Sequence, residues 1–266
     1  MSLVTVEHRG ATALITYANP PLGTMTAAGS AEMLSIVLTA AEDVAVKAIV
    51  LTGSLPGIFV RHYDVGELST ASDSLEGAPA APRPAAGSQP EGGAFGQLID
   101  LLASAPKPVI CAINGLCMGG GFEMTLASDI RIAGEDVTAI GLPETRVGIF
   151  PGGGGTQRLP RVIGEARALE MILRGRVVDG PEAGRIGLVH EVVADPLARA
   201  LEIAAEFETR GADGVAYAKR LTRAALDRPL AEGLSDERRS FVEVMKTESA
   251  RQALRAARPP AQIQDA

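Results

Sequence analysis

The sequence predicts an α/β or mixed fold, because stretches typical of strands take turns with stretches typical of helices. Residues 4–6 and 13–17 alternate and are rich in β-branched side chains, as in two adjoining strands. Residues 47–52 and 109–113 are short apolar runs of the kind found in buried strands. Apolar residues at helical spacing lie between these segments, so strands and helices follow one another along the chain.

The first 40 residues predict a hairpin followed by a capped helix. The two N-terminal strands are expected to join through a polar turn at residues 8–10. Asn19-Pro20-Pro21 then breaks the pattern, and the Thr26 hydroxyl can accept a hydrogen bond from the first turn of a helix. A later helix is expected over residues 95–102. The first helix carries four apolar residues that we expect on one face: Met33, Leu34, Val37 and Leu38.

Composition and charge exclude several classes of protein. With 266 residues and 46% hydrophobic side chains, the chain can bury a sizeable core, which excludes a disordered or fibrous protein. The net charge of -7 argues against a general affinity for nucleic acid or anionic lipid. Cys111 and Cys117 are too few for a disulfide scaffold, and no zinc-type cluster accompanies them.

The sequence also carries expectations about location. Residues 1–7 lack the basic segment and apolar run of a secretory signal. No stretch approaches the roughly eighteen uninterrupted apolar residues that a membrane-spanning helix needs. We therefore expect a cytoplasmic protein with neither a membrane nor a nucleic acid as partner.

Residues 69–93 are rich in Ala, Pro, Gly and Ser, a composition that buries too little apolar surface to order itself. We expect a mobile insertion here. A linker between two domains is the alternative, but the rhythm of strands and helices resumes directly afterwards, which favours an insertion within one domain.

A glycine cluster, Gly119-Gly120-Gly121, lies between a buried strand and an apolar run that favours a helix. Glycines let the backbone approach a ligand closely, and the free N–H groups of a helix start can stabilise an anion. The dinucleotide, nucleotide and serine-hydrolase motifs are all absent, so an oxyanion site is the functional interpretation. The alternative is a packing contact, with Glu123 on a solvated face.

A second glycine-rich segment, residues 141–159, places Glu144 in a loop just after an expected strand. Loop carboxylates are usually solvated. Two acids near a backbone oxyanion site could instead hold one water molecule and move protons to and from carbon, which needs no metal. The pair Glu123 and Glu144 is therefore the candidate catalytic unit.

The segment between residues 107 and 159 contains a series of short motifs in a fixed order: Lys107-Pro108-Val109-Ile110, Asn114-Gly115, Gly119-Gly120-Gly121, Glu123, Asp129, Pro143-Glu144, Gly148, Pro151-Gly152 and Gly154-Gly155-Thr156-Gln157-Arg158-Leu159. In order and spacing this run resembles the enoyl-CoA hydratase/isomerase (crotonase) family. Weaker similarity extends from the N-terminal hairpin to about Arg255.

The resemblance implies a spiral core of repeated ββα units over residues 1–200 and a C-terminal helical region over residues 201–266. It also implies homotrimers, which often pair as hexamers. The ligands that the resemblance implies are acyl-CoA thioesters. Coenzyme A is then part of the substrate, so no separate cofactor is expected.

The resemblance further implies the roles of site residues. The thioester oxygen would accept hydrogen bonds from the backbone N–H groups of Gly120 and Tyr63, and Asp64, Val65 and Gly66 would line the same wall. Both hydratase carboxylates are present, which favours hydration of a 2-enoyl-CoA to a 3-hydroxyacyl-CoA. Glu123 would orient and deprotonate water for attack at Cβ, and Glu144 would deliver a proton to Cα.

Several positions depart from the family's pattern. Arg61-His62 stands where the family usually has Ala-Gly. The side chain of His62 could contact the ligand, fill space or face solvent. The family's lysine that contacts coenzyme A corresponds to Leu22, and another lysine common in the family corresponds to Gly66, so contacts to the phosphates of coenzyme A must come from elsewhere. Other readings therefore stay open: an isomerase, hydrolase or lyase acting on an acyl-CoA, or an acyl-CoA-binding protein without turnover.

Overall fold

A computed structural model describes residues 2–79 and 92–257. Strands β1 (Val4–Arg9) and β2 (Thr12–Tyr17) form the expected antiparallel hairpin. The expected turn at residues 8–10 is wrong by two positions, because His8 and Arg9 still pair with β2. The chain reverses at Gly10, whose φ of 57° is the left-handed conformation that glycine adopts without strain.

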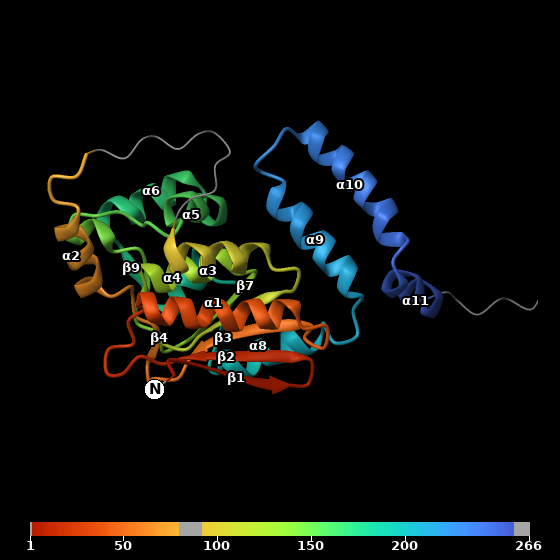
Figure 1. Cartoon of the computed structure of the whole chain (residues 1–266), viewed down its shortest axis with the longest axis horizontal. Helices are drawn as coiled ribbons and strands as arrows, with labels where there is room; N and C mark the ends of the chain where they lie inside the picture. The colour runs from red at the N-terminus through yellow and green to blue at the C-terminus, as the bar shows by residue number, and fades with distance from the viewer. Residues whose placement is uncertain (1, 80–91, 258–266) are drawn as a thin grey trace, which may run out of the picture.

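The larger sheet has six strands in the order β1-β2-β3-β5-β7-β10 and is parallel from β2 onward. Its β1-β2 hairpin lies along the lower edge of the molecule in Figure 1. β3 and β5 are buried throughout, as their unbroken apolar sequences predict. The strands that join the hairpin are β3 (Ala48–Gly53), β5 (Val109–Ile113), β7 (Ile130–Gly134) and β10 (Glu191–Val193).

A second sheet of four short strands has the order β4-β6-β8-β9. The chain moves from the first sheet to the second three times, from β3 to β4, β5 to β6 and β7 to β8, and a helix follows each time. This is the expected ββα repeat, and its helices all begin beside the second sheet. The strands of the second sheet are β4 (Ile58–Val60), β6 (Leu116–Met118), β8 (Ile140–Gly141) and β9 (Val177–Val178). The helices that follow the first three of them are α2 (Val65–Ser74), α4 (Gly120–Ala127) and the short 3-10 helix η1 (Glu144–Val147).

Helices cover both faces of the large sheet. Ile49 and Leu51 of β3 belong to the main core with α1 (Ala27–Glu42) and α3 (Gly93–Ser104), whereas Val50 packs toward α8 (Pro196–Ala205). This separation follows from the alternation of side chains along a strand. The remaining helices of the core are α5 (Gly155–Ile163), α6 (Glu165–Arg174) and α7 (Gly180–Arg185).

The first helix confirms one sequence expectation and corrects another. Thr26 is the N-cap of α1, and its hydroxyl accepts a hydrogen bond from the N–H of Gly29 at 3.0 Å. Met33 and Val37 are buried, but Leu38 is 45% exposed because it lies at the edge of the face that meets the core.

No helix among the described residues is long and apolar enough to cross a membrane.

The expected insertion at 69–93 is partly helical. Residues 69–74 complete α2, whose N-cap Asp64 accepts a hydrogen bond from Glu67 N–H, and α3 begins at Gly93. The centre of the segment, residues 80–91, lies outside the described residues. The expected mobility of that part therefore stays a prediction.

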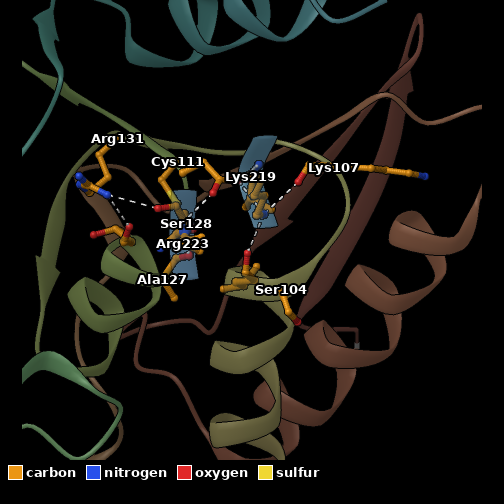
Figure 2. A network of polar contacts seen from close by, with 12 residues as sticks. Ser104, Lys107, Cys111, Ala127, Ser128, Arg131, Lys219 and Arg223 are labelled. Atoms are coloured by element: carbon orange, nitrogen blue, oxygen red, sulfur yellow. Dashed lines mark hydrogen bonds and ion pairs between the residues drawn. The ribbon is translucent and has the colours of Figure 1, made fainter. Parts of the chain in front are cut away.

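Three C-terminal helices stand apart from the sheets in Figure 1, and we call them the C-terminal arm: α9 (Ala212–Ala224), α10 (Leu230–Met245) and α11 (Glu248–Ala256). Its anchor is a polar network at the end of α4 (Figure 2). The Lys219 ammonium donates to the carbonyls of Leu102 and Lys107 and lies 2.7 Å from Asp129, and Arg223 donates to Asp129 at 2.8 Å. Asp129 thus joins the arm to the core.

Candidate active site

Helix α4 carries Glu123 into the interior. All eight residues of α4 are buried, and Glu123 itself is 3% exposed. Gly121 allows the helix to lie against β4, since a Cβ there would come 2.0 Å from the carbonyl oxygen of Val60. The alternative that Glu123 occupies a solvated face is therefore wrong.

Two backbone donors from the second glycine-rich segment hold the Glu123 carboxylate. Its Oε1 accepts hydrogen bonds from the N–H of Gly153 at 2.7 Å and of Gly155 at 2.8 Å. Burial raises the pKa of Glu123, and these two hydrogen bonds oppose that rise. The carboxyl group is therefore oriented through one oxygen, while Oε2 lies 2.8 Å from where a Cβ on Gly153 would be.

Glu144 begins η1, directly after β8. Its Oε1 lies 3.3 Å from where a Cβ on Gly119 would be, so the carboxyl group approaches the start of α4. Its Oε2 is buried, and within the described part of the chain it has no hydrogen-bond partner. Burial, with a smaller effect from the neighbouring Glu123, raises the pKa of Glu144 to about 7. A carboxyl group with this pKa can give up a proton at neutral pH.

The two expected oxyanion donors lie side by side. Gly120 is the first residue of α4, so its N–H has no acceptor within the helix. Tyr63 pairs with Met25 in a parallel bridge that uses the carbonyl of His62 and the N–H of Asp64, which turns the Tyr63 N–H to the other side. The Tyr63 nitrogen lies 3.5 Å from where a Cβ on Gly120 would be. Two N–H groups so arranged can stabilise one oxyanion.

A cavity of about 1050 Å³ joins these groups. Both glutamates, Gly120 and Tyr63 line it, and so do Val65 and Gly66, two of the three residues expected on the same wall. Asp64 does not line the cavity, because its carboxylate accepts from Thr24 and from Glu67 N–H and so caps α2. The other lining residues come mainly from α2, η1 and the loop after η1: Glu67, Leu68, Thr70, Ala71, Ser74, Arg146, Val147, Ile149, Phe150, Gly152 and Gly153.

The unusual pair Arg61-His62 divides between two environments. His62 lines the cavity, half-buried, with its Nδ1 2.7 Å from the Tyr63 carbonyl oxygen. Arg61 is half-buried but does not line the cavity, and its Nε is buried without a hydrogen-bond partner among the described residues. Of the two side chains, His62 is thus the one placed to contact a ligand.

Phe95 is a cavity residue that sequence reasoning missed. Its ring packs edge-on against Tyr63, with ring centroids 5.3 Å apart, and reaches within 3.1 Å of where a Cβ on Gly120 would be. The expected helix included Phe95, but periodicity assigns such a residue to the core, and nothing local indicates a ligand wall. The N–H groups of Gly153 and Gly155 were also missed, although a glycine run before a helix is a recognisable anion-binding signal.

The chain is similar to known proteins of one family. The sequence model of the enoyl-CoA hydratase/isomerase family matches residues 7–261. YngF of Bacillus subtilis, named as a candidate enoyl-CoA hydratase/isomerase, is 46% identical over 158 residues, which are 59% of this chain and 60% of that protein. The mitochondrial methylglutaconyl-CoA hydratase of Rattus norvegicus is 35% identical over 86% of this chain and 72% of that protein.

A solved structure extends the likeness to the fold. The crystal structure of enoyl-CoA hydratase from Bacillus anthracis has 31% identity and a TM-score of 0.82, covering 96% of this chain and 95% of that one. Its sheets and C-terminal helices therefore correspond to those described above. The chain belongs to the enoyl-CoA hydratase/isomerase family.

Proposed function

We propose that this protein hydrates a 2-enoyl-CoA thioester to a 3-hydroxyacyl-CoA. The observation that carries the proposal is one cavity lined by two glutamates in different electrostatic environments, beside two backbone N–H groups. Glu123 is oriented by two backbone donors, whereas Glu144 has a pKa of about 7. One acid is therefore suited to accept a proton and the other to give one.

The proposed reaction adds the elements of water across the carbon–carbon double bond. Glu123 accepts a proton from water as the water oxygen bonds to Cβ, and the π electrons move toward the thioester oxygen. The N–H groups of Gly120 and Tyr63 stabilise the negative charge on that oxygen. Glu144 then gives its proton to Cα, and exchange with solvent restores both carboxyl groups.

A panel of enoyl-CoA esters of differing length and branching tests the proposal, followed by loss of absorbance at the conjugated double bond. Hydration of at least one ester, with a 3-hydroxyacyl product, is the expected result. A shifted double bond would indicate an isomerase instead, and free coenzyme A a hydrolase. Thermal stabilisation by esters without turnover would indicate an acyl-CoA-binding protein.

Arg146 favours a second, narrower candidate, an enoyl-CoA whose acyl part carries a carboxylate. Among the described residues that line the cavity, Arg146 is the sole Lys or Arg. It takes part in no ion pair with another described residue. A methylglutaconyl group, named for the Rattus norvegicus relative, has such a carboxylate. Arg146→Ala should then raise KM for carboxylated esters and leave KM for crotonyl-CoA nearly unchanged; equal effects on both would exclude this candidate.

The C-terminal arm supports the proposal that the chain forms homotrimers or hexamers. Four apolar residues of α10 recur at intervals of four and seven, which places them on one face of the helix. All of them are exposed in the single chain: Leu230, Leu234, Phe241 and Met245. An apolar stripe of this kind is typical of a surface that packs against another chain.

A further inference from the structure

Arg158, on the first turns of α5, lies behind the loop that holds Glu123. Its side chain is 22% exposed, and it is not one of the residues that line the cavity. Its Nη1 donates to the carbonyl of Gly153 at 3.0 Å, and its Nη2 lies 3.6 Å from the Asp100 carboxylate on α3. The guanidinium thus links α3 to the glycine-rich loop.

That loop is shaped around the guanidinium. Gly153 accepts from Arg158 through its carbonyl and donates to Glu123 through its N–H. The next residue, Gly154, has a φ of 100°, and a Cβ there would come 2.0 Å from Arg158 Nη1. A side chain at Gly154 would therefore displace the guanidinium and strain the backbone, and the same tight turn brings the N–H of Gly155 to the same carboxylate oxygen.

We propose that Arg158 is a positioning residue: it holds the Gly153 peptide so that the N–H groups of Gly153 and Gly155 converge on Oε1 of Glu123 and leave Oε2 as the atom that accepts the proton from water. The role of Oε2 rests on the proposed hydration, whereas the positioning of the carboxylate does not.

The arrangement of the two oxygens supports this assignment. Oε1 accepts two short hydrogen bonds, which lower its basicity. Oε2 lies 2.8 Å from where a Cβ on Gly153 would be, and both Gly153 and Glu123 line the cavity. A carboxylate held through one oxygen presents the other in a fixed direction, which general-base catalysis requires.

Charge alone could give Arg158 an influence on Glu123, since the guanidinium also lowers the pKa of that carboxyl group across space. The two explanations predict different results for Arg158→Lys: a lysine can replace the charge of the arginine but not its hydrogen-bonding geometry. Arg158→Lys keeps the positive charge, but a single ammonium cannot reach Gly153 and Asp100 together as the guanidinium fork does. Arg158→Met removes both the charge and the hydrogen bond while keeping much of the apolar volume.

The test compares Arg158→Met and Arg158→Lys with Arg161→Met, a matched control on the same helix whose ion pair with Asp227 is exposed. In Arg158→Met we expect kcat to fall about 10- to 100-fold with KM changed less than about threefold. The acidic limb of the kcat/KM profile should move to higher pH, because Glu123 loses groups that favour its ionised form. Arg158→Lys should recover only part of kcat, and Arg161→Met should resemble the wild type.

A second readout keeps the inference separate from the proposed reaction. The pKa of Glu123 can be followed by NMR of protein with ¹³C-labelled glutamate carboxyl groups, assigned with Glu123→Gln. In Arg158→Met it should rise whether or not any ester is hydrated. Full kcat and an unchanged pKa of Glu123 in folded Arg158→Met would overturn the inference. So would Arg158→Lys with the kcat and the Glu123 pKa of the wild type, because the effect of Arg158 would then be one of charge. A wild type without turnover would overturn the proposed function and leave the titration test intact.

Discussion

Helices α4 and α10 are held in place in opposite ways. All eight residues of α4 are buried, and its close approach to β4 depends on a glycine. Of the sixteen residues of α10, the buried ones are Asp236 and Ser240, both polar, while Phe241 is 61% exposed. Asp236 forms ion pairs with Arg220, Arg228 and Arg239. Apolar packing therefore places α4, and charged contacts place α10.

This difference separates the part of the candidate site around Glu123 from the C-terminal arm. Glu123 lies where packing leaves little freedom, so its position can be maintained by one chain. No apolar residue of α9, α10 or α11 is fully buried, and α10 carries several exposed ones. We therefore expect changes in the core to affect chemistry and changes in the arm to affect assembly and stability.

The largest expected effect comes from the paired acids. Glu123→Gln and Glu144→Gln should each lower kcat for the best ester by about 10²- to 10⁴-fold, because each removes a group that we propose transfers a proton. Steady-state kinetics on the ester panel measures this. Circular dichroism serves as the folding control, and near-normal turnover in either folded variant would contradict the assignment.

The anchor of the arm should give the next largest effect. Asp129→Asn removes the negative charge from between Lys219, whose side chain is 8% exposed, and Arg223. A buried ammonium left without its counter-charge is costly, so we expect a loss of about 2 to 4 kcal/mol in the free energy of unfolding. Urea titration measures the loss. Arg251→Gln, which breaks an exposed ion pair with Glu248 on α11, should change stability by less than about 0.5 kcal/mol.

The substitution Glu144→Gln, which should lower activity, should raise stability at alkaline pH, because of the raised pKa of Glu144. The folded pKa of about 7 exceeds the reference value of 4.5, so the stabilisation from proton binding is complete below pH 4.5 and is lost as the pH rises through 7. Glu144→Gln cannot ionise. At pH 8 it should be more stable than the wild type by about 1 to 2 kcal/mol, after allowing for partial solvent screening, and the difference should shrink toward pH 5. Urea titrations at both pH values check the sign.

The stripe on α10 should affect assembly without affecting the fold of one chain. Phe241→Glu places a charge on an exposed position, so the secondary structure should remain. If the stripe packs against a second copy, the subunit dissociation constant should rise at least about tenfold. Sedimentation velocity across a concentration series measures this, and unchanged assembly would exclude the stripe as the interface.

The smallest expected effect concerns Arg61 and His62. His62 lines the cavity, so His62→Gly with Arg61→Ala should raise kcat/KM for crotonyl-CoA a few-fold relative to larger or polar acyl groups. The control is His62→Gly alone, which should produce most of the change because Arg61 does not line the cavity. Equal ratios across the ester panel would show that neither side chain contacts the acyl group.

The local chemistry of the sequence was enough to predict the hairpin, the Thr26 cap, the buried strands and the glycine cluster. Each of these depends on residues within a few positions of one another, through side-chain alternation, a capping hydroxyl or a helix start. The two glycine-rich segments also indicated Glu123 and Glu144 as a candidate pair. The separate role expected of each acid came from the family resemblance, which carries long-range information that spacing alone does not.

Only the tertiary structure decided the environment of those residues. The pKa of Glu144 depends on burial, and the orientation of Glu123 depends on N–H groups about 30 residues further along the chain. Phe95 and Arg158 reach the site from helices whose periodicity marks them only as helical residues. The physical reason is that burial and hydrogen-bond convergence belong to the packed arrangement of distant segments, and no local pattern encodes them.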